Sequence, residues 1–310
     1  GFIEREQVRR LMADGGTFVM ESCQRVHPKI GHLSRSFEQT FHCPSPVNLY
    51  VTPPAAQGFQ PHFDIQNVFV LQLHGTKKWR VFEPHIQKPL PSQAVDGSVQ
   101  PGELLRELTL HPGDLLYLPR GYVHVAQTTN ELSAHLSVSL LPQTWADVFK
   151  ALMEELPADD RFRTAIRLQP EGPAEATADM EQTFEHLIEA FSSGSDLEDA
   201  LDGLAKRFVS TRLPATSGQL EALSNNDPVM LQSRLRRHPG IIWRVDSDGE
   251  RAHLHFHGKT TSVPWTAIQA LRHMASGETF CVTDIPGDIS DDTRCELAQH
   301  LVDEGFLIRA

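Results

Sequence analysis

The sequence is poor in the features that mark secreted, membrane-spanning and nucleic-acid-binding proteins. It has four cysteines in 310 residues and no Cys-x-x-Cys pair, so we expect free thiols and a cytoplasmic location. No apolar run approaches the roughly 20 residues that a membrane-spanning helix needs. Only 28 Lys and Arg residues stand against 40 Asp and Glu, a net charge of −12. This balance argues against a broad nucleic-acid-binding surface and favours a basic protein tail or peptide as the partner.

Short strands separated by tight turns are predicted in the first half of the chain. Residues 67–73 are rich in branched and aromatic side chains, and a turn at 74–76 leads into a returning strand. The predicted strands cover residues 67–73, 77–82, 108–110, 115–118, 123–128 and 133–140. Strands of this length, with turns every eight to twelve residues, indicate a sandwich or a double-sheet barrel. A closed barrel of this kind holds a small ligand in its mouth.

Three polar residues in this strand-rich region fit a metal site. His62 and Asp64 are two residues apart in an extended stretch, so their side chains share one face. His124 follows the bend Pro119-Arg-Gly121 and is expected to point inward, toward the other two. Two histidines and one carboxylate form the facial triad of non-haem Fe(II) oxygenases, which leaves three metal positions open.

The segments around these residues resemble the JmjC-type ribosomal oxygenases. The resemblance covers residues 47–141 and rests on four segments: Asn48-Leu-Tyr-Val-Thr-Pro53, Pro61-His-Phe-Asp64, Val70-Leu-Gln-Leu-His-Gly-Thr-Lys-Lys-Trp-Arg80, and Pro112-Gly-Asp-Leu-Leu-Tyr-Leu-Pro-Arg-Gly121. It implies a double-stranded β-helix (cupin or JmjC) barrel that uses Fe(II), 2-oxoglutarate and O2. The best-known members of this family hydroxylate side chains of ribosomal proteins, and Arg and His are the expected residue types.

The resemblance also implies roles for individual residues. By position, His62, Asp64 and His124 match the catalytic metal ligands. Lys77 matches the cation that pairs with the far carboxylate of 2-oxoglutarate, and a charge-assisted hydrogen bond gives that pairing a physical basis. Without the resemblance, Lys77 reads as a solvated hairpin residue beside Lys78.

Four further positions match family residues around the cosubstrate and the substrate. Asn48, Tyr50 and His135 match positions that line the cosubstrate pocket, and Ser139 matches a substrate contact. Asn48 and Tyr50 share a strand face because they are two residues apart. Ordinary strand packing remains the alternative for both, and a satisfied core histidine remains the alternative for His135.

Residues 144–215 are predicted to be helical and to follow a catalytic barrel at residues 1–143. Apolar residues recur at helical spacing in 145–156, after Thr144 as the N-cap, and again in 180–191. Ser195-Asp-Leu-Glu198 has the pattern of a capping box that opens a further helix. The resemblance implies that this region forms a homodimer, and the alternative is that its apolar faces pack on the barrel.

Residues 216–310 are predicted to form a winged-helix-like domain. The pattern predicts helices at 227–237, 263–274 and 293–305, a hairpin at 241–245 and 251–257, and a closing strand at 305–308. Acidic residues outnumber basic ones here, which argues against DNA binding and favours a role in interaction or dimer support. His253, His255 and His257 alternate on one predicted strand, where the polar face of a half-exposed strand is a better interpretation than a zinc site.

Several other functions remain open on the sequence. A JmjC demethylase would apply the same iron chemistry to an N-methyl group, but many demethylases have Glu where this chain has Asp64. A hydroxylase of a non-ribosomal peptide would keep the same site. A non-oxygenase cupin would not need Lys77 in its pocket, and the intact metal triad argues against a catalytically silent binding module.

Overall fold

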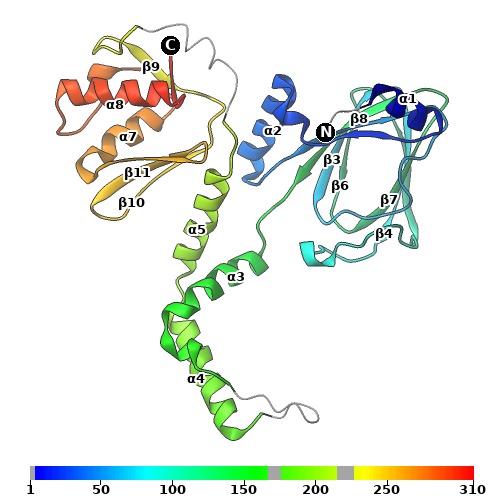
Figure 1. Cartoon of the computed structure of the whole chain (residues 1–310), viewed down its shortest axis with the longest axis horizontal. Helices are drawn as coiled ribbons and strands as arrows, with labels where there is room; N and C mark the ends of the chain where they lie inside the picture. The colour runs from blue at the N-terminus through cyan, green and yellow to red at the C-terminus, as the bar shows by residue number, and fades with distance from the viewer. Residues whose placement is uncertain (1–3, 167–175, 215–226) are drawn as a thin grey trace.

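The computed structural model describes residues 4–166, 176–214 and 227–310. Figure 1 shows a β-barrel, a run of helices, and a small α+β unit that follow one another along the chain. No helix in the described ranges is both long enough and apolar enough to cross a membrane.

Two antiparallel sheets form the barrel. The larger sheet has the strand order β1-β2-β8-β3-β6, and the smaller has the order β5-β4-β7. In chain order these strands are β1 Phe18–Met20, β2 Val47–Thr52, β3 Asn67–His74, β4 Lys77–Pro84, β5 Leu104–Leu110, β6 Leu115–Leu118, β7 Tyr122–Thr128 and β8 Ser133–Leu140. The barrel strands predicted from the sequence are all present, and β5 begins four residues earlier than predicted.

Side-chain alternation on β4 explains how this strand supplies the barrel interior. Lys77, Trp79 and Val81 are buried, whereas Lys78 and Arg80 are exposed. Strand side chains alternate between the two faces, so the buried set shares the inner face. The buried lysine is therefore Lys77 and not Lys78, which is compatible with the pocket role that the resemblance implies for Lys77.

One helix precedes the first barrel strand, and a second lies between β1 and β2 along the chain. These are α1 Arg5–Ala13 and α2 Pro28–Phe41. Phe37 of α2 meets Phe69 of β3 edge to face, with ring centroids 5.2 Å apart. Glu38 forms a buried ion pair with Arg212 and so joins α2 to the chain beyond the helical region. Helix α2 therefore contacts both the barrel and the segment that leads from α5 to the C-terminal unit.

The predicted helical region contains α3 Trp145–Glu155, α4 Ala178–Gly194 and α5 Leu197–Ser210. Thr144 caps α3 as predicted, because its side chain accepts a hydrogen bond from the backbone N–H of Asp147. The cap of α5 is Asp196 rather than Ser195, since the Asp196 carboxylate accepts from two backbone N–H groups of the first turn. Val148 and Leu204 bury part of the α3 and α5 surfaces against each other.

The C-terminal unit has two three-stranded sheets and, in residues 227–310, two α-helices. Its elements are β9 Arg234–Arg237, β10 Trp243–Ser247, β11 Arg251–Phe256, β12 Lys259–Pro264, α7 Ile268–Ala275, β13 Phe280–Cys281, α8 Asp291–Asp303 and β14 Leu307–Arg309. The sheets have the orders β10-β11-β12 and β13-β9-β14. Leu235, Phe256, Leu271 and Phe306 are completely or almost completely buried in one shared core.

The predicted helix over residues 227–237 is wrong. Residues 234–237 form strand β9, which pairs with β13 and β14 on its two sides. Within this segment Leu235 is buried between two exposed arginines, which is the period of a strand. The helix predicted at 263–274 is also shorter than expected, because β12 occupies its first residues.

Candidate active site

A short backbone bridge brings His62 and His124 together. The His124 N–H donates to the His62 carbonyl at 2.8 Å, and the His62 N–H donates back to the His124 carbonyl at 3.2 Å. The extended stretch predicted around His62 and Asp64 is therefore one isolated bridge and not a full strand. The Gly121 N–H donates to the Asp64 carbonyl at 2.8 Å, which holds the third residue beside the bend before β7.

The side chains of these three residues can supply one metal ion with ligands. One ligand atom from each of His62, Asp64 and His124 lies within 4.8 Å of the others. No other group of three His, Cys, Asp or Glu residues in the described ranges meets this condition. The three predicted ligands thus form the one metal-compatible cluster in the part of the chain that the structure describes.

Hydrogen bonds engage Nδ1 of both histidines and leave Nε2 of each ring available to bind a metal. Nδ1 of His62 lies 2.8 Å from the carbonyl of Gln60, and Nδ1 of His124 lies 3.1 Å from the carbonyl of Tyr122. A carbonyl accepts only, so each Nδ1 carries the proton and each Nε2 keeps its lone pair for a metal. Burial lowers the pKa of His124 despite the nearby Asp64 carboxylate, which favours the neutral imidazole that binds metal.

A cavity of about 260 Å³ extends from this cluster into the barrel. Besides the three candidate ligands, its lining includes Tyr50, Lys77 and His135, which the sequence predicted for the cosubstrate. Residues from β2, β4 and β8 therefore converge with the metal cluster on one space. A small molecule in this cavity would contact both the metal ion and the buried lysine.

Lys77 is a buried cation with no acidic partner. The residue is 3% exposed, and its Nζ donates to the Thr52 hydroxyl at 3.0 Å. In the part of the chain that the structure describes, Lys77 forms no ion pair. Burial lowers the pKa of Lys77 to about 8, because the charged form loses its hydration. An anion that enters the cavity would supply the missing counter-charge.

His135 and Tyr50 form a flat wall of the same cavity. Their rings are stacked, with centroids 4.9 Å apart and an angle of 2° between the planes. Nδ1 of His135 is buried and meets no hydrogen-bond partner. Burial, and then the charge of Lys77, lowers the pKa of His135 to about 3, so the ring is neutral at neutral pH. The neutral ring leaves Lys77 as the cation of this part of the cavity, which fits a carboxylate-bearing cosubstrate.

Asn48 and Ser139 were predicted near the cosubstrate and the substrate, but they lie outside the cavity lining. The Asn48 side-chain oxygen accepts a hydrogen bond from the Ser22 backbone N–H at 3.0 Å, which ties β2 to the segment before α2. Ser139 is buried, and its N–H donates to the Pro46 carbonyl. The geometry thus gives Asn48 a structural contact and keeps Ser139 away from the cavity.

Several residues near the cavity were missed by the sequence analysis, and four of them have a polar or aromatic side chain. Trp79, Ser137 and Phe59 line it, and Thr52 binds Lys77 from behind. Trp79 and Ser137 lie two residues beyond Lys77 and His135, so strand alternation could have placed both on the inner face. Phe59 precedes the bridge in a loop, where no periodicity indicates its direction.

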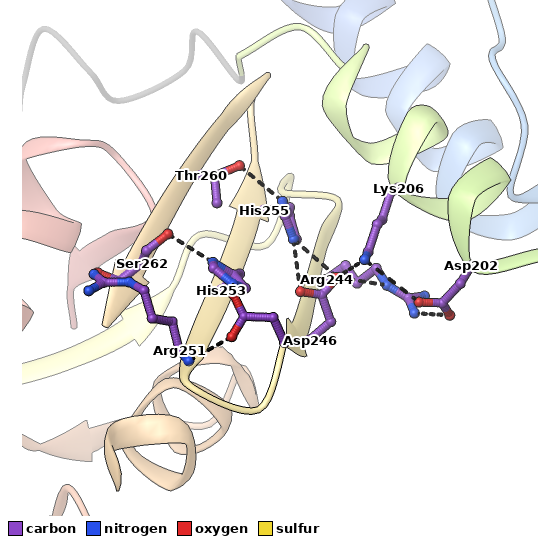
Figure 2. A network of polar contacts seen from close by, with 10 residues as sticks. Asp202, Lys206, Arg244, Asp246, Arg251, His253, His255, Thr260 and Ser262 are labelled. Atoms are coloured by element: carbon purple, nitrogen blue, oxygen red, sulfur yellow. Dashed lines mark hydrogen bonds and ion pairs between the residues drawn. The ribbon is translucent and has the colours of Figure 1, made fainter. Parts of the chain in front are cut away.

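The histidines of β11 do not form a metal site. Figure 2 shows His253 and His255 in a polar network with neighbouring side chains. His253 contacts Ser262 and Asp248 through its two ring nitrogens, and those of His255 contact Thr260 and Asp246. Both rings are therefore hydrogen-bonded within the protein, in agreement with the predicted polar strand face. His257, which was predicted on the same face, instead follows the end of β11 and is buried, with a φ of 50°.

A larger cavity, of about 1070 Å³, lies between α2 and the start of the C-terminal unit. Its lining includes Arg35 and Arg212 but none of the predicted site residues. It has no cluster of metal ligands. The volume of a cavity therefore does not identify the active site in this protein. The side chains that line the smaller cavity identify it as the candidate active site.

Replacement of Asp64 by alanine should abolish metal binding. The two histidines would remain, but the site would lose the only carboxylate of the cluster. Changes even outside the ligand set cost about ten- to a hundredfold in metal affinity, so we expect a loss of more than about a hundredfold. Titration calorimetry with Co(II) measures the metal affinity. His253→Ala is the control and should bind Co(II) like the wild type, and equal binding by Asp64→Ala would contradict the assignment.

Comparisons with known proteins identify relatives of this chain. Residues 20–148 match the JmjC domain model. "Ribosomal oxygenase 1" of Gallus gallus is 32% identical over 228 residues, which cover 67% of this chain and 38% of that protein. The "bifunctional lysine-specific demethylase and histidyl-hydroxylase NO66" of Culex quinquefasciatus is 29% identical over 233 residues, 66% of this chain and 36% of that protein. The chain thus spans little more than a third of the length of these relatives.

The fold of the chain also has a counterpart among solved structures. The ribosomal oxygenase YcfD from Escherichia coli, solved in complex with cobalt and 2-oxoglutarate, superposes with a TM-score of 0.57. The superposition covers 94% of this chain and 78% of YcfD, at 19% sequence identity. This likeness extends over the helical region and the C-terminal unit. Residues 20–148 thus form a JmjC domain, and a ribosomal oxygenase is among the relatives of this chain.

Proposed function

We propose that the chain is an Fe(II)- and 2-oxoglutarate-dependent oxygenase that hydroxylates a protein side chain. The observation that carries this proposal is that one cavity contains both a 2-His-1-carboxylate cluster and a buried lysine with no acidic partner. A non-oxygenase cupin needs the metal cluster but does not need the buried lysine. The relatives named as a ribosomal oxygenase and a histidyl-hydroxylase support the same class of reaction.

Each part of the cavity has a role in this proposal. His62, Asp64 and His124 hold Fe(II), which when bound activates O2 together with 2-oxoglutarate. Lys77 and His135 fix the far end of the cosubstrate, so that its other end faces the ligand cluster. Tyr50 closes one side of the cavity and keeps water from that face. The protein thus contributes orientation and exclusion of water, while the cofactor supplies the oxidation.

The substrate we favour is an Arg or His side chain of a ribosomal protein. The net charge of −12 would attract a basic peptide, and ribosomal proteins are rich in basic tails. The NO66 relatives are named as lysine-specific demethylases as well as hydroxylases, so N-demethylation is the second candidate. Ser139, which the resemblance suggested as a substrate contact, is not part of the proposal because it lies outside the cavity lining.

We further propose three domains: a catalytic barrel at 1–143, a helical dimerisation region at 144–215, and a winged-helix-like domain at 216–310. Apolar side chains that are more than half exposed on α3 and α4 support a homodimer through the helices. These are Trp145, Phe149, Met153 and Phe184. The four cysteines are all free thiols, which is compatible with the expected cytoplasmic location.

A turnover assay on basic peptides tests the proposed activity. Wild-type protein with Fe(II), 2-oxoglutarate and O2 should release succinate and add the mass of one oxygen atom to an Arg- or His-containing ribosomal peptide. His124→Ala should do neither. Loss of the mass of a methylene group from a methyl-lysine peptide would favour demethylation instead. No succinate from protein that binds both metal and 2-oxoglutarate would overturn the oxygenase proposal.

Removal of the Lys77 ammonium should weaken the binding of 2-oxoglutarate. A hydrogen bond to a charged group contributes about 1.5–3 kcal/mol, so Lys77→Ala should raise the dissociation constant roughly tenfold to a hundredfold. Titration calorimetry on Zn(II)-loaded protein measures this without turnover. Lys78→Ala, on the opposite face of β4, is the matched control, and equal small effects would show that the cosubstrate is held elsewhere.

The pH dependence of this binding follows from the same residue. The pKa of Lys77 is about 8 in the free protein and should rise when a carboxylate binds. The cation is present below pH 8, so affinity should be highest there. Above pH 8 binding must take up a proton, and affinity should fall by up to about tenfold per pH unit. Lys77→Met should show no such fall, and a wild-type affinity that stays constant from pH 7 to pH 9 would refute this role.

The helical region should assemble two copies of the chain. Phe184 on α4 is 64% exposed, and a charge there would be buried in the proposed interface. We expect Phe184→Glu to sediment as a folded monomer and the wild type as a dimer. Gln182→Glu adds the same charge on another side of α4 and should leave the dimer intact. A wild-type monomer at high concentration would refute the interface, because such interfaces are large and apolar.

A further inference from the structure

The larger cavity, of about 1070 Å³, brings together distant parts of the chain, and we call it the junction cavity. Its lining includes residues of α2, of the segment 211–214 after α5, and of the turn 238–240 after β9. In Figure 1, α2 lies between the barrel and the C-terminal unit. The Gln39 side chain donates to the Pro239 carbonyl at 2.8 Å, and Arg35 Nη2 donates to the Leu213 carbonyl at 2.6 Å. Hydrogen bonds therefore fix the walls of this cavity to one another.

The charge of this lining is opposite to that of the whole chain. The chain has a net charge of −12, but the junction cavity is lined by the arginines Arg25, Arg35 and Arg212 and by a single carboxylate, that of Glu38. Three guanidinium charges against one carboxylate leave an excess of +2 when the histidines of the lining are counted as neutral. Basic side chains around one cavity of an acidic protein favour a negatively charged ligand there.

Arg35 and Arg212 share the single carboxylate. Arg35 Nη1 lies 3.0 Å from Glu38 Oε2, and Arg212 Nη1 contacts Glu38 Oε1. The side chains of the two arginines are only 12% and 10% exposed, so water hydrates their charges poorly. Within the described residues, neither arginine forms an ion pair with any other carboxylate. A buried charge costs free energy unless a counter-charge is present, and one of these two guanidinium charges lacks one.

Two pKa shifts reflect the same excess of positive charge. Burial lowers the pKa of Arg35, Glu38 offsets part of this effect, and the charge of Arg212 adds to it. Burial, and then the charges of Arg35 and His238, lower the pKa of His257 to about 4. A further cation is therefore disfavoured beside Arg35, and an anion is favoured at the same place.

The number of charges selects the class of anion. Arg25 is exposed at the same cavity and, in the part of the chain that the structure describes, has no ion-pair partner. Guanidinium groups present paired donors that match the oxygens of a phosphate or a carboxylate. A phosphate monoester carries about −1.5 to −2 at pH 7, whereas one carboxylate carries a single charge. The excess of +2 therefore fits a phosphate, and a cavity of about 1070 Å³ has room for its organic group.

We propose that the junction cavity binds the phosphate group of a small phosphate monoester through Arg25, Arg35 and Arg212. The dianion supplies the missing counter-charge, while Glu38 continues to hold the two buried guanidinium groups in position. The ligand contacts both α2 and the segment after α5, so its binding stabilises the position of α2 against the C-terminal unit. This site is separate from the barrel cavity and does not depend on the proposed oxygenase activity.

Titration calorimetry on the metal-free wild-type protein tests the site, with inorganic phosphate and then with glycerol 3-phosphate as a simple monoester. Both should bind once per chain, and acetate at equal ionic strength should bind more weakly because it carries less charge. Arg212→Gln leaves Glu38 balanced by Arg35 alone, so the dissociation constant of phosphate should rise roughly tenfold to a hundredfold. Arg207→Gln is the control, because Arg207 pairs with Glu154 outside the lining and should bind phosphate like the wild type.

A second variant keeps the test valid if Arg212→Gln does not fold. Ser36 is exposed on α2 and lines the cavity, and its hydroxyl donates to the His32 carbonyl one turn earlier. Ser36→Asp adds a negative charge to the lining and should raise the dissociation constant of phosphate at least about fivefold. Ser193→Asp is the matched control, because the Ser193 hydroxyl makes the same contact to the Glu189 carbonyl on α4, outside the lining.

The outcomes separate this site from the barrel cavity. Weaker phosphate binding by Arg212→Gln and Ser36→Asp, with both controls unchanged, supports the proposal. Equal binding by the wild type and these two variants, or no phosphate binding by the wild type, overturns it. Phosphate binding that is lost in Lys77→Ala and kept in Arg212→Gln would place the anion in the barrel cavity and also overturn it. Binding of 2-oxoglutarate and release of succinate test the oxygenase proposal alone.

Discussion

The site depends on one pair of backbone hydrogen bonds, between His62 and His124. They join a loop residue to the start of β7 and so place two side chains from distant parts of the sequence on one cavity. The bend before β7 permits this approach only with glycine at position 121. Its backbone angle φ is +90°, and a β-carbon there would lie 1.9 Å from the Ile86 carbonyl oxygen. A larger residue at Gly121 would displace the second histidine from the first.

Groups that lack partners in the protein define the rest of the cavity. The fold buries the Lys77 ammonium beside a single hydroxyl, and it buries nitrogens of Trp79 and His135 with no acceptor. Each is unfavourable in the isolated chain, because hydration is lost and no equivalent contact replaces it. A carboxylate in the cavity would relieve the first of these costs. Ligand affinity and local instability therefore have the same physical origin, and the bound protein should be more resistant to unfolding.

The sequence predicts most of the barrel and the central residues of the site, because both follow from local patterns. Period-two alternation separates Lys77 from Lys78, and the bend before β7 points His124 inward. Other features depend on contacts with distant segments, which a local sequence pattern cannot predict. Strand β9 forms because β13 and β14 pair with it on both sides, which overrides the helical interpretation of residues 227–237. The hydrogen bond that turns Asn48 toward Ser22 likewise comes from a separate segment.

A crystal structure of the protein with Co(II) and 2-oxoglutarate tests the central claim most directly. The account predicts one metal ion bound by His62 Nε2, an Asp64 carboxylate oxygen and His124 Nε2, with ligand distances of about 2.0–2.2 Å. It also predicts that 2-oxoglutarate lies between that ion and Lys77 Nζ. A metal ion bound elsewhere, such as at the histidines of β11, or a cosubstrate whose carboxylates both lie away from Lys77, would contradict it.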